Sequence, residues 1–123
     1  MPKNDYWKLS AYESARLIKD GSITAEDLVS SCIERVNQTN NKINAIVDDL
    51  SASALEKAHE LDKLTKKGKF QGPLHGVPIT IKENIDQKGY ATPNGLEALK
   101  DFIAPGNAPV VDNLEKDLSL IHI

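Results

Sequence analysis

Residues 72–84 of this 123-residue chain read GPLHGVPITIKEN, and this stretch decides the fold. A loop rich in glycine and proline leads into a short run of branched apolar residues that alternate with more polar ones. This alternation predicts a strand over 77–82, since proline is tolerated where a strand begins. The sequence therefore predicts a strand with Lys82 at its carboxyl end.

A lysine in that position has two interpretations. If both faces of the sheet are covered, burial disfavours the ammonium form of Lys82, and a neutral lysine can act as a base. The alternative is an edge lysine whose ammonium reaches solvent, and the pattern alone favours this one. Glu83 and Asp86 flank the lysine and could tune it, although paired surface charges are the default explanation.

The composition excludes several classes of protein. A net charge of -3 and a pI near 5.6 argue against a nucleic-acid groove or a surface for anionic membranes. No apolar run approaches the roughly 18 residues of a membrane-spanning helix, and the polar residues 1–5 are not followed by the apolar run of a signal peptide. Because the lone Cys32 cannot form an internal disulfide, we expect a cytoplasmic protein.

Helical periodicity dominates the first half of the chain. A helix over 9–20 begins with Ser10 and Glu13 at the spacing of a capping box. A second helix begins at Thr24 and is expected to end at the polar string 37–41.

The rest of the chain alternates between helix and strand. The expected elements are a strand or extended link over 43–47, a helix from Ser51 to just before Gly68, the strand over 77–82, a loop over 86–95, a helical turn over 97–102, a helix over 108–117 and a strand over 118–123.

This alternation predicts an α/β fold with parallel strand pairing. We expect one segment, 1–123, with helices over 1–70 and the start of an α/β core over 71–123. Only two or three strands are predicted, and parallel strands need cover on both faces. The sequence therefore resembles the beginning of a larger fold.

Other reactive residues have simpler explanations. Cys32 could pair with one of the three histidines, His59, His75 or His122, but it lies on the apolar face of a predicted helix, where a free cysteine is usually a small hydrophobe. The histidines lack metal-ligand spacing, so we expect no metal and no cofactor. The basic cluster reads as a solvated helix end: Lys63, Lys66, Lys67 and Lys69. The serines lie in no Gly-x-Ser-x-Gly setting.

The motif at 72–85, GPLHGVPITIKENI, resembles the N-terminal block of the amidase signature family. The similarity continues in both directions along the chain. It includes ITA at 23–25, INA at 43–45, Lys88-Gly89, Thr92, Gly95, Leu99 and NAPVV at 107–111. It covers about 9–114, and its central motif is long. Members include general amidases, fatty-acid and peptide amidases, and the amidotransferase subunit that feeds ammonia to misacylated tRNA.

The resemblance implies a large mixed sheet with helices on both faces, of which this chain holds the first strands and is expected to be an incomplete part. It also implies a Ser–cis-Ser–Lys mechanism in which Lys82 is the catalytic lysine, acting on a small-molecule amide. Glu83 stands where many members carry aspartate, and both occur. In the family pattern, both serines and the oxyanion loop follow this chain's last residue.

The sequence therefore predicts an amidase-type hydrolase segment that carries the lysine and is inactive alone. Two alternatives remain open. One is a non-catalytic interaction module, and the other is one half of a split amidase or amidotransferase. No nucleic-acid or membrane partner is expected, whereas self-association through exposed apolar faces is plausible.

Overall fold

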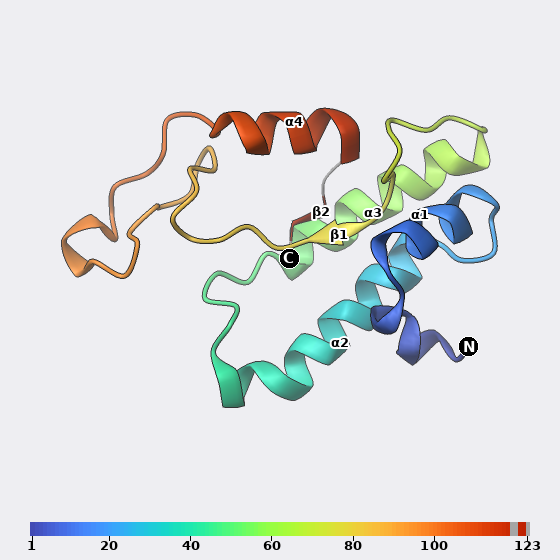
Figure 1. Ribbon diagram of the computed structural model, residues 1–123, viewed down its shortest axis with the longest axis horizontal. Coiled ribbons are helices and arrows are strands. Elements are labelled where there is room, and N and C mark those ends of the chain that lie inside the picture. The colour runs from blue at the N-terminus through green and yellow to red at the C-terminus, as the bar shows by residue number, and fades with distance from the viewer. Residues whose placement is uncertain (119–120, 123) are drawn as a thin grey trace.

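The computed structural model describes residues 1–118 and 121–122, and within them helices outweigh strands (Figure 1). The helical elements are η1 (Lys3–Lys8), α1 (Ala11–Lys19), α2 (Ala25–Ile43), α3 (Ser51–Lys66), η2 (Glu97–Leu99) and α4 (Pro109–Leu118). The strands are β1 (Pro78–Ile79) and β2 (Ile121–His122).

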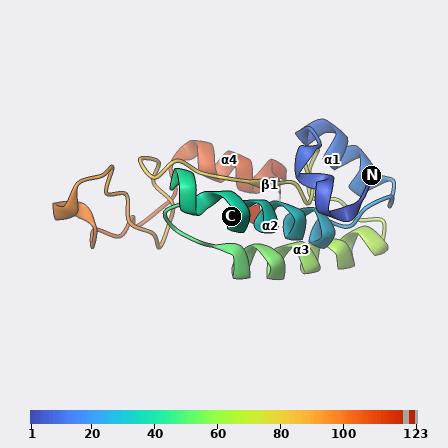
Figure 2. The ribbon, with the colours of Figure 1, turned by 90° about the horizontal axis from the view of Figure 1, so that it is seen from below.

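The two strands pair in parallel, as the alternation of elements predicts. Pro78 is opposite Ile121 and Ile79 is opposite His122. Figure 2 shows β1 between α4 on one side and the pair formed by α2 and α3 on the other. This arrangement confirms the α/β class.

The helix starts are built as their sequences predict. At α1, the Ser10 hydroxyl accepts the Glu13 backbone N–H, while the Glu13 carboxylate accepts the Ser10 N–H at 2.9 Å, which completes the capping box. At α2, the Thr24 hydroxyl accepts the Asp27 N–H at 3.0 Å. Each cap satisfies backbone donors that the first helical turn leaves without an intrahelical partner.

The predicted end of α2 is wrong. The helix continues through the polar string 37–41 to Ile43 and ends at Asn44, whose φ of 48° lies in the left-handed region. Asparagine tolerates this conformation better than most residues, so it ends the helix in place of glycine. Of the strand or extended link expected over 43–47, Ile43 is helical, and 44–47 form a link without a strand partner in the described part of the chain.

The predicted strands are longer than the observed ones. Of the run 77–82, the described part of the chain shows pairing only at Pro78–Ile79, opposite Ile121–His122. Lys82 therefore lies beyond the end of β1. Leu118, predicted to open the last strand, instead ends α4, and positions 119, 120 and 123 lie outside the described residues.

The main apolar core is formed by the first three α-helices and the turn before α2. Its buried members are Ile18, Ile23, Ala25, Leu28, Val29, Ala54, Ala58 and Leu61. Gly76 packs directly on this core with φ of +81°, and a Cβ atom there would lie 2.8 Å from the Ala25 Cβ atom. The 72–76 loop thus approaches the helices as closely as a glycine allows, and it fixes where β1 begins.

Residues 89–104 form a hairpin that extends away from the helices (orange in Figures 1 and 2). The Gly89 N–H donates to the Ala104 carbonyl at 3.1 Å, and the Ala104 N–H donates to the Tyr90 carbonyl at 2.9 Å. Several large apolar side chains on it are exposed: Leu96, Leu99, Phe102 and Ile103. No helix of the described residues is long and apolar enough to cross a membrane.

Candidate functional site

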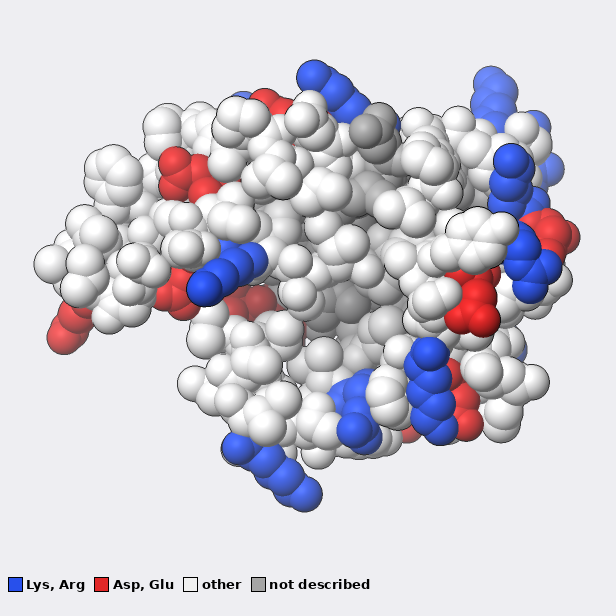
Figure 3. Space-filling view, viewed as in Figure 1, with Lys and Arg blue, Asp and Glu red and all other residues white. Residues whose placement is uncertain are grey.

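A hollow of about 550 Å³ lies between the loop after α2 and the chain that leaves β1. Figure 3 shows the face of the molecule hollowed near its centre, with charged side chains around the edge. The hollow is lined by Ala45, Ile46, Val47, Asp48, Leu50, Thr80, Ile81, Lys82, Glu83, Asn84, Ile85, Gln87, Tyr90, Ala91 and Asn94. One wall, 45–50, is mostly apolar, whereas the wall over 80–94 carries most of the polar groups.

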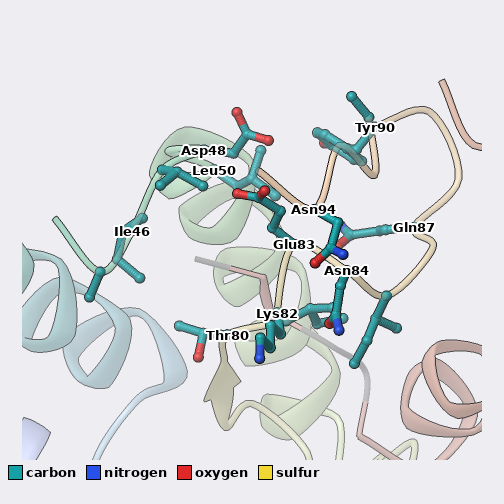
Figure 4. Close-up of a pocket in the computed structure, with 15 residues that line it drawn as sticks. Ile46, Asp48, Leu50, Thr80, Lys82, Glu83, Asn84, Gln87, Tyr90 and Asn94 are labelled. Carbon is teal, nitrogen blue, oxygen red and sulfur yellow. The ribbon is translucent and has the colours of Figure 1, made fainter. Parts of the chain in front are cut away.

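Lys82 lies on the polar wall and is exposed. Its side chain extends beside Thr80 and Asn84 (Figure 4). Among the side chains that the structure describes, none makes an ion pair or a hydrogen bond with its ammonium. Its carbonyl accepts the Ile85 N–H at 3.0 Å, closing a turn that leads the chain away from β1. The structure therefore presents Lys82 as a solvent-reaching lysine in a hollow.

Glu83 does not pair with its neighbour Lys82. The two side chains leave the backbone in opposite directions (Figure 4), and the Glu83 carboxylate accepts the Gly95 backbone N–H at 2.6 Å. Asp86 is exposed, and its carbonyl accepts the Ala108 N–H at 2.8 Å. Among the described residues, neither carboxylate therefore contacts the Lys82 ammonium directly.

The apolar wall is held by one side chain of α2. The Asn40 side-chain amide donates to the Ile46 carbonyl at 2.9 Å, and its oxygen accepts the Ile46 N–H at 2.8 Å. These two hydrogen bonds fix the loop after α2 against the helix. Sequence reasoning missed Asn40 because the polar string around it reads as the end of a helix.

The polar wall is tied to the start of α4 through Asn107. The Asn107 side-chain oxygen accepts the Lys88 N–H at 2.7 Å, and its amide donates to Asp112 at 3.0 Å and to Glu115 at 3.2 Å. Asn94, in the same wall, has φ of 47°. The dipeptide Asn94-Gly95 is a turn signal that could have identified this residue from sequence.

His75 is a buried structural residue. Its Nδ1 accepts the Gln71 N–H at 3.2 Å, and its Nε2 lies 3.0 Å from the Thr65 hydroxyl and 3.2 Å from the Leu61 carbonyl. Because a carbonyl can only accept, Nε2 carries the hydrogen. His75 therefore fastens the 72–76 loop to α3.

The structure gives no support to a thiol–imidazole pair. Cys32 packs against the helical core, and burial raises the pKa of its thiol. The His59 ring lies 3.4 Å from the Glu26 carboxylate, and the His122 side chain is outside the described part. Among the described side chains, no group of three or more His, Cys, Asp or Glu is arranged to hold a metal ion.

We compared the chain with known proteins, and the relatives it matches include an amide hydrolase and an amidotransferase subunit. The chain is 49% identical over 115 residues to an indoleacetamide hydrolase of Bradyrhizobium diazoefficiens, a match over 94% of this chain and 22% of the relative. It is 33% identical to a glutamyl-tRNA(Gln) amidotransferase subunit of Natranaerobius thermophilus, covering 93% of this chain and 23% of that relative.

A solved structure of a fatty acid amide hydrolase superposes with a TM-score of 0.91 at 27% identity, covering 99% of this chain and 22% of that one. The chain thus spans less than a quarter of the length of each of these three relatives. The family model described as Amidase matches residues 27–121. This match covers most of the chain, including β1 and the whole hollow, so the chain belongs to the amidase family.

Proposed function

We propose that this chain supplies the lysine of an enzyme that hydrolyses amide carbon–nitrogen bonds by a Ser–cis-Ser–Lys mechanism. The observation that carries the proposal is the position of Lys82. It lies just beyond β1 in the wall of a hollow, and among the described residues nothing competes for its ammonium. A base with its nitrogen free is available to a partner that approaches across the hollow.

The proposed steps use Lys82 only for proton transfer. The neutral amine accepts a proton through a bridging serine, which deprotonates the nucleophilic serine. That serine forms a bond to the amide carbon, the carbon–nitrogen bond breaks, and ammonia or an amine leaves with the returned proton. Water then hydrolyses the acyl-enzyme ester. Both serines are expected from sequence that does not belong to these 123 residues.

The exposure of Lys82 is informative for this mechanism. Covering a lysine disfavours its charged form, and Lys82 is uncovered in the described part of the molecule. We infer that the serine-bearing part, once packed over the hollow, both covers the lysine and supplies the nucleophile. The 123-residue chain alone is therefore expected to be inactive.

The walls of the hollow fit an amide with an apolar acyl group. Ile46, Val47 and Leu50 offer apolar surface opposite the polar residues around Lys82. The greater similarity to a hydrolase named for indoleacetamide than to an amidotransferase component favours hydrolysis over ammonia transfer. An amidotransferase segment remains the second candidate.

The test is a chimera in which this chain replaces the matched N-terminal segment of the Bradyrhizobium indoleacetamide hydrolase. We expect the chimera to release ammonia from indoleacetamide and to react with a serine-directed fluorophosphonate, whereas the 123-residue chain alone does neither. Lys82→Ala should lower kcat by at least about a hundredfold, because general-base catalysis contributes that much.

Lys88→Ala is the matched control, because Lys88 is an exposed lysine on the same loop whose backbone, not its ammonium, makes the contact to Asn107. It should leave turnover unchanged. A folded chimera without turnover, or a Lys82→Ala chimera with full turnover, would contradict the proposal.

A further inference from the structure

We propose that Glu83 is a positioning residue of the Lys82 site, whose carboxylate holds the 93–96 turn in place as one wall of the hollow. The contact between Glu83 and the turn is seen in the structure. Its effect on catalysis rests on the proposed function. The family assignment does not by itself give Glu83 this role.

The first step is the contact itself. The Glu83 Oε1 atom accepts the Gly95 N–H at 2.6 Å, across twelve residues of chain. A hydrogen bond from a backbone N–H to a carboxylate is short and roughly twice as strong as a neutral one. This hydrogen bond joins Glu83, the neighbour of Lys82, to the far end of the polar wall.

The second step is that the position of the turn depends on this hydrogen bond. Asn94 and Gly95 both have positive φ, 47° and 75°, a conformation that asparagine and glycine tolerate, so these two residues set the local shape of the turn but not its position against the hollow. The Leu96 N–H donates to the Pro93 carbonyl at 2.8 Å, but this bond lies within the turn. The adjacent Thr92 hydroxyl is buried without a partner among the described residues, so it does not anchor the turn with a second hydrogen bond.

The third step connects the turn to the site. The Asn94 side chain extends into the hollow toward Asn84, on the wall that also carries Lys82 (Figure 4). Releasing the turn would move this amide and the wall behind it. Since the Glu83 and Lys82 side chains point apart, the effect is on how a substrate is held, and the lysine's proton transfer is left intact.

The contact is tested in the 123-residue chain by hydrogen exchange. Glu83→Leu removes the acceptor and should raise the exchange rate of the Gly95 amide by about tenfold or more, as expected for the loss of one charge-assisted hydrogen bond. Glu83→Gln keeps a neutral acceptor oxygen and should restore part of the protection, so that its exchange rate lies between those of Glu83→Leu and the unsubstituted chain. Glu97→Gln is the control, because the Glu97 side chain is 90% exposed and its ion pair is with Lys100 on the same turn.

The consequence is tested in the chimera described above. Glu83→Leu should raise KM about tenfold while kcat and the pH dependence of kcat stay close to those of the unsubstituted chimera. Glu83→Gln should lie near the unsubstituted values. A shift of the pH profile in both variants would overturn the proposal, because it would mean that the Glu83 charge tunes Lys82.

The two proposals fail separately. An unsubstituted chimera that folds but has no turnover contradicts the proposed function, and Gly95 exchange in the 123-residue chain still decides whether Glu83 holds the turn. Unchanged Gly95 exchange in Glu83→Leu overturns the positioning role whatever the chimera does.

Discussion

Gly76 is the residue at which the 72–76 loop meets the helical core. Its backbone has φ of +81°, which L side chains rarely adopt, and an added Cβ atom would lie 2.8 Å from the Ala25 Cβ atom and 3.1 Å from the Ile18 Cδ1 atom. The requirement for glycine is therefore double, conformational and steric. The sequence could indicate the turn, but the contact with two helices depends on packing between distant segments.

We predict that Gly76→Ala lowers the free energy of unfolding by about 2–4 kcal/mol, combining about 1 kcal/mol for the left-handed backbone with the cost of overpacking the core. Gly89→Ala is the matched control, since Gly89 has φ of +86° but nothing within 4 Å of an added Cβ atom. It should lose only about 1 kcal/mol. Urea unfolding followed by circular dichroism measures both variants, and equal losses would contradict the steric part.

The Cys32 thiol is predicted to react slowly with alkylating reagents. Burial raises the pKa of its side chain, so the thiol stays protonated to higher pH than a free cysteine and little reactive thiolate is present near neutral pH. Labelling by iodoacetamide should be roughly tenfold or more slower in the native chain than in urea, and should speed up only as the pH rises. Fast native labelling near pH 7 would show that the Cys32 thiol is accessible and contradict its packing against the helical core.

At the scale of elements, local signals predicted helix starts well and strand extents poorly. The caps at Ser10 and Thr24 lie three residues before the backbone N–H groups that donate to them, so a short window of sequence contains the whole interaction. The length of β1 depends on a partner strand more than forty positions away. The prediction of where α2 ends failed for a related reason. The Asn40 side chain makes its hydrogen bonds to Ile46, beyond the helix, and not within its own turn.

Asp62 shows a cap that no local pattern contains. It lies on α3, is buried, and accepts the Ala25 N–H at 2.8 Å and the Glu26 N–H at 3.0 Å at the start of α2. We predict that Asp62→Ala lowers the free energy of unfolding by about 1–3 kcal/mol, because one buried and one partly buried backbone donor lose their acceptor.

Asp62→Asn keeps one acceptor oxygen and should cost less than Asp62→Ala. Glu60→Ala, at an exposed position of the same helix, is the control and should change stability by less than about 0.5 kcal/mol. Chemical unfolding of the three variants gives the comparison. A loss for Asp62→Ala no larger than that for Glu60→Ala would exclude an effective cap.

For the whole molecule, the amidase motif and its lysine could be identified from sequence, whereas the hollow could not. One wall, 45–50, is held by Asn40, and the other, 80–94, is held by Glu83 and Asn107. None of these contacts follows from periodicity. The exposed apolar side chains of the 89–104 hairpin are compatible with the expected self-association, which stays a prediction that sedimentation at increasing concentration can test.

The same organisation predicts where the molecule opens first. The buried core lies among α1, α2 and α3, whereas the 89–104 hairpin extends from it and leaves Leu96 and Phe102 exposed. Segments with few buried apolar contacts open at low free-energy cost. Limited trypsin digestion should therefore cleave after Lys100 before it cleaves after Lys57, which lies within α3. In a Lys100→Gln variant the early product should disappear while the helical core stays intact, and early cleavage within α2 or α3 instead would show that the core is no more stable than the hairpin.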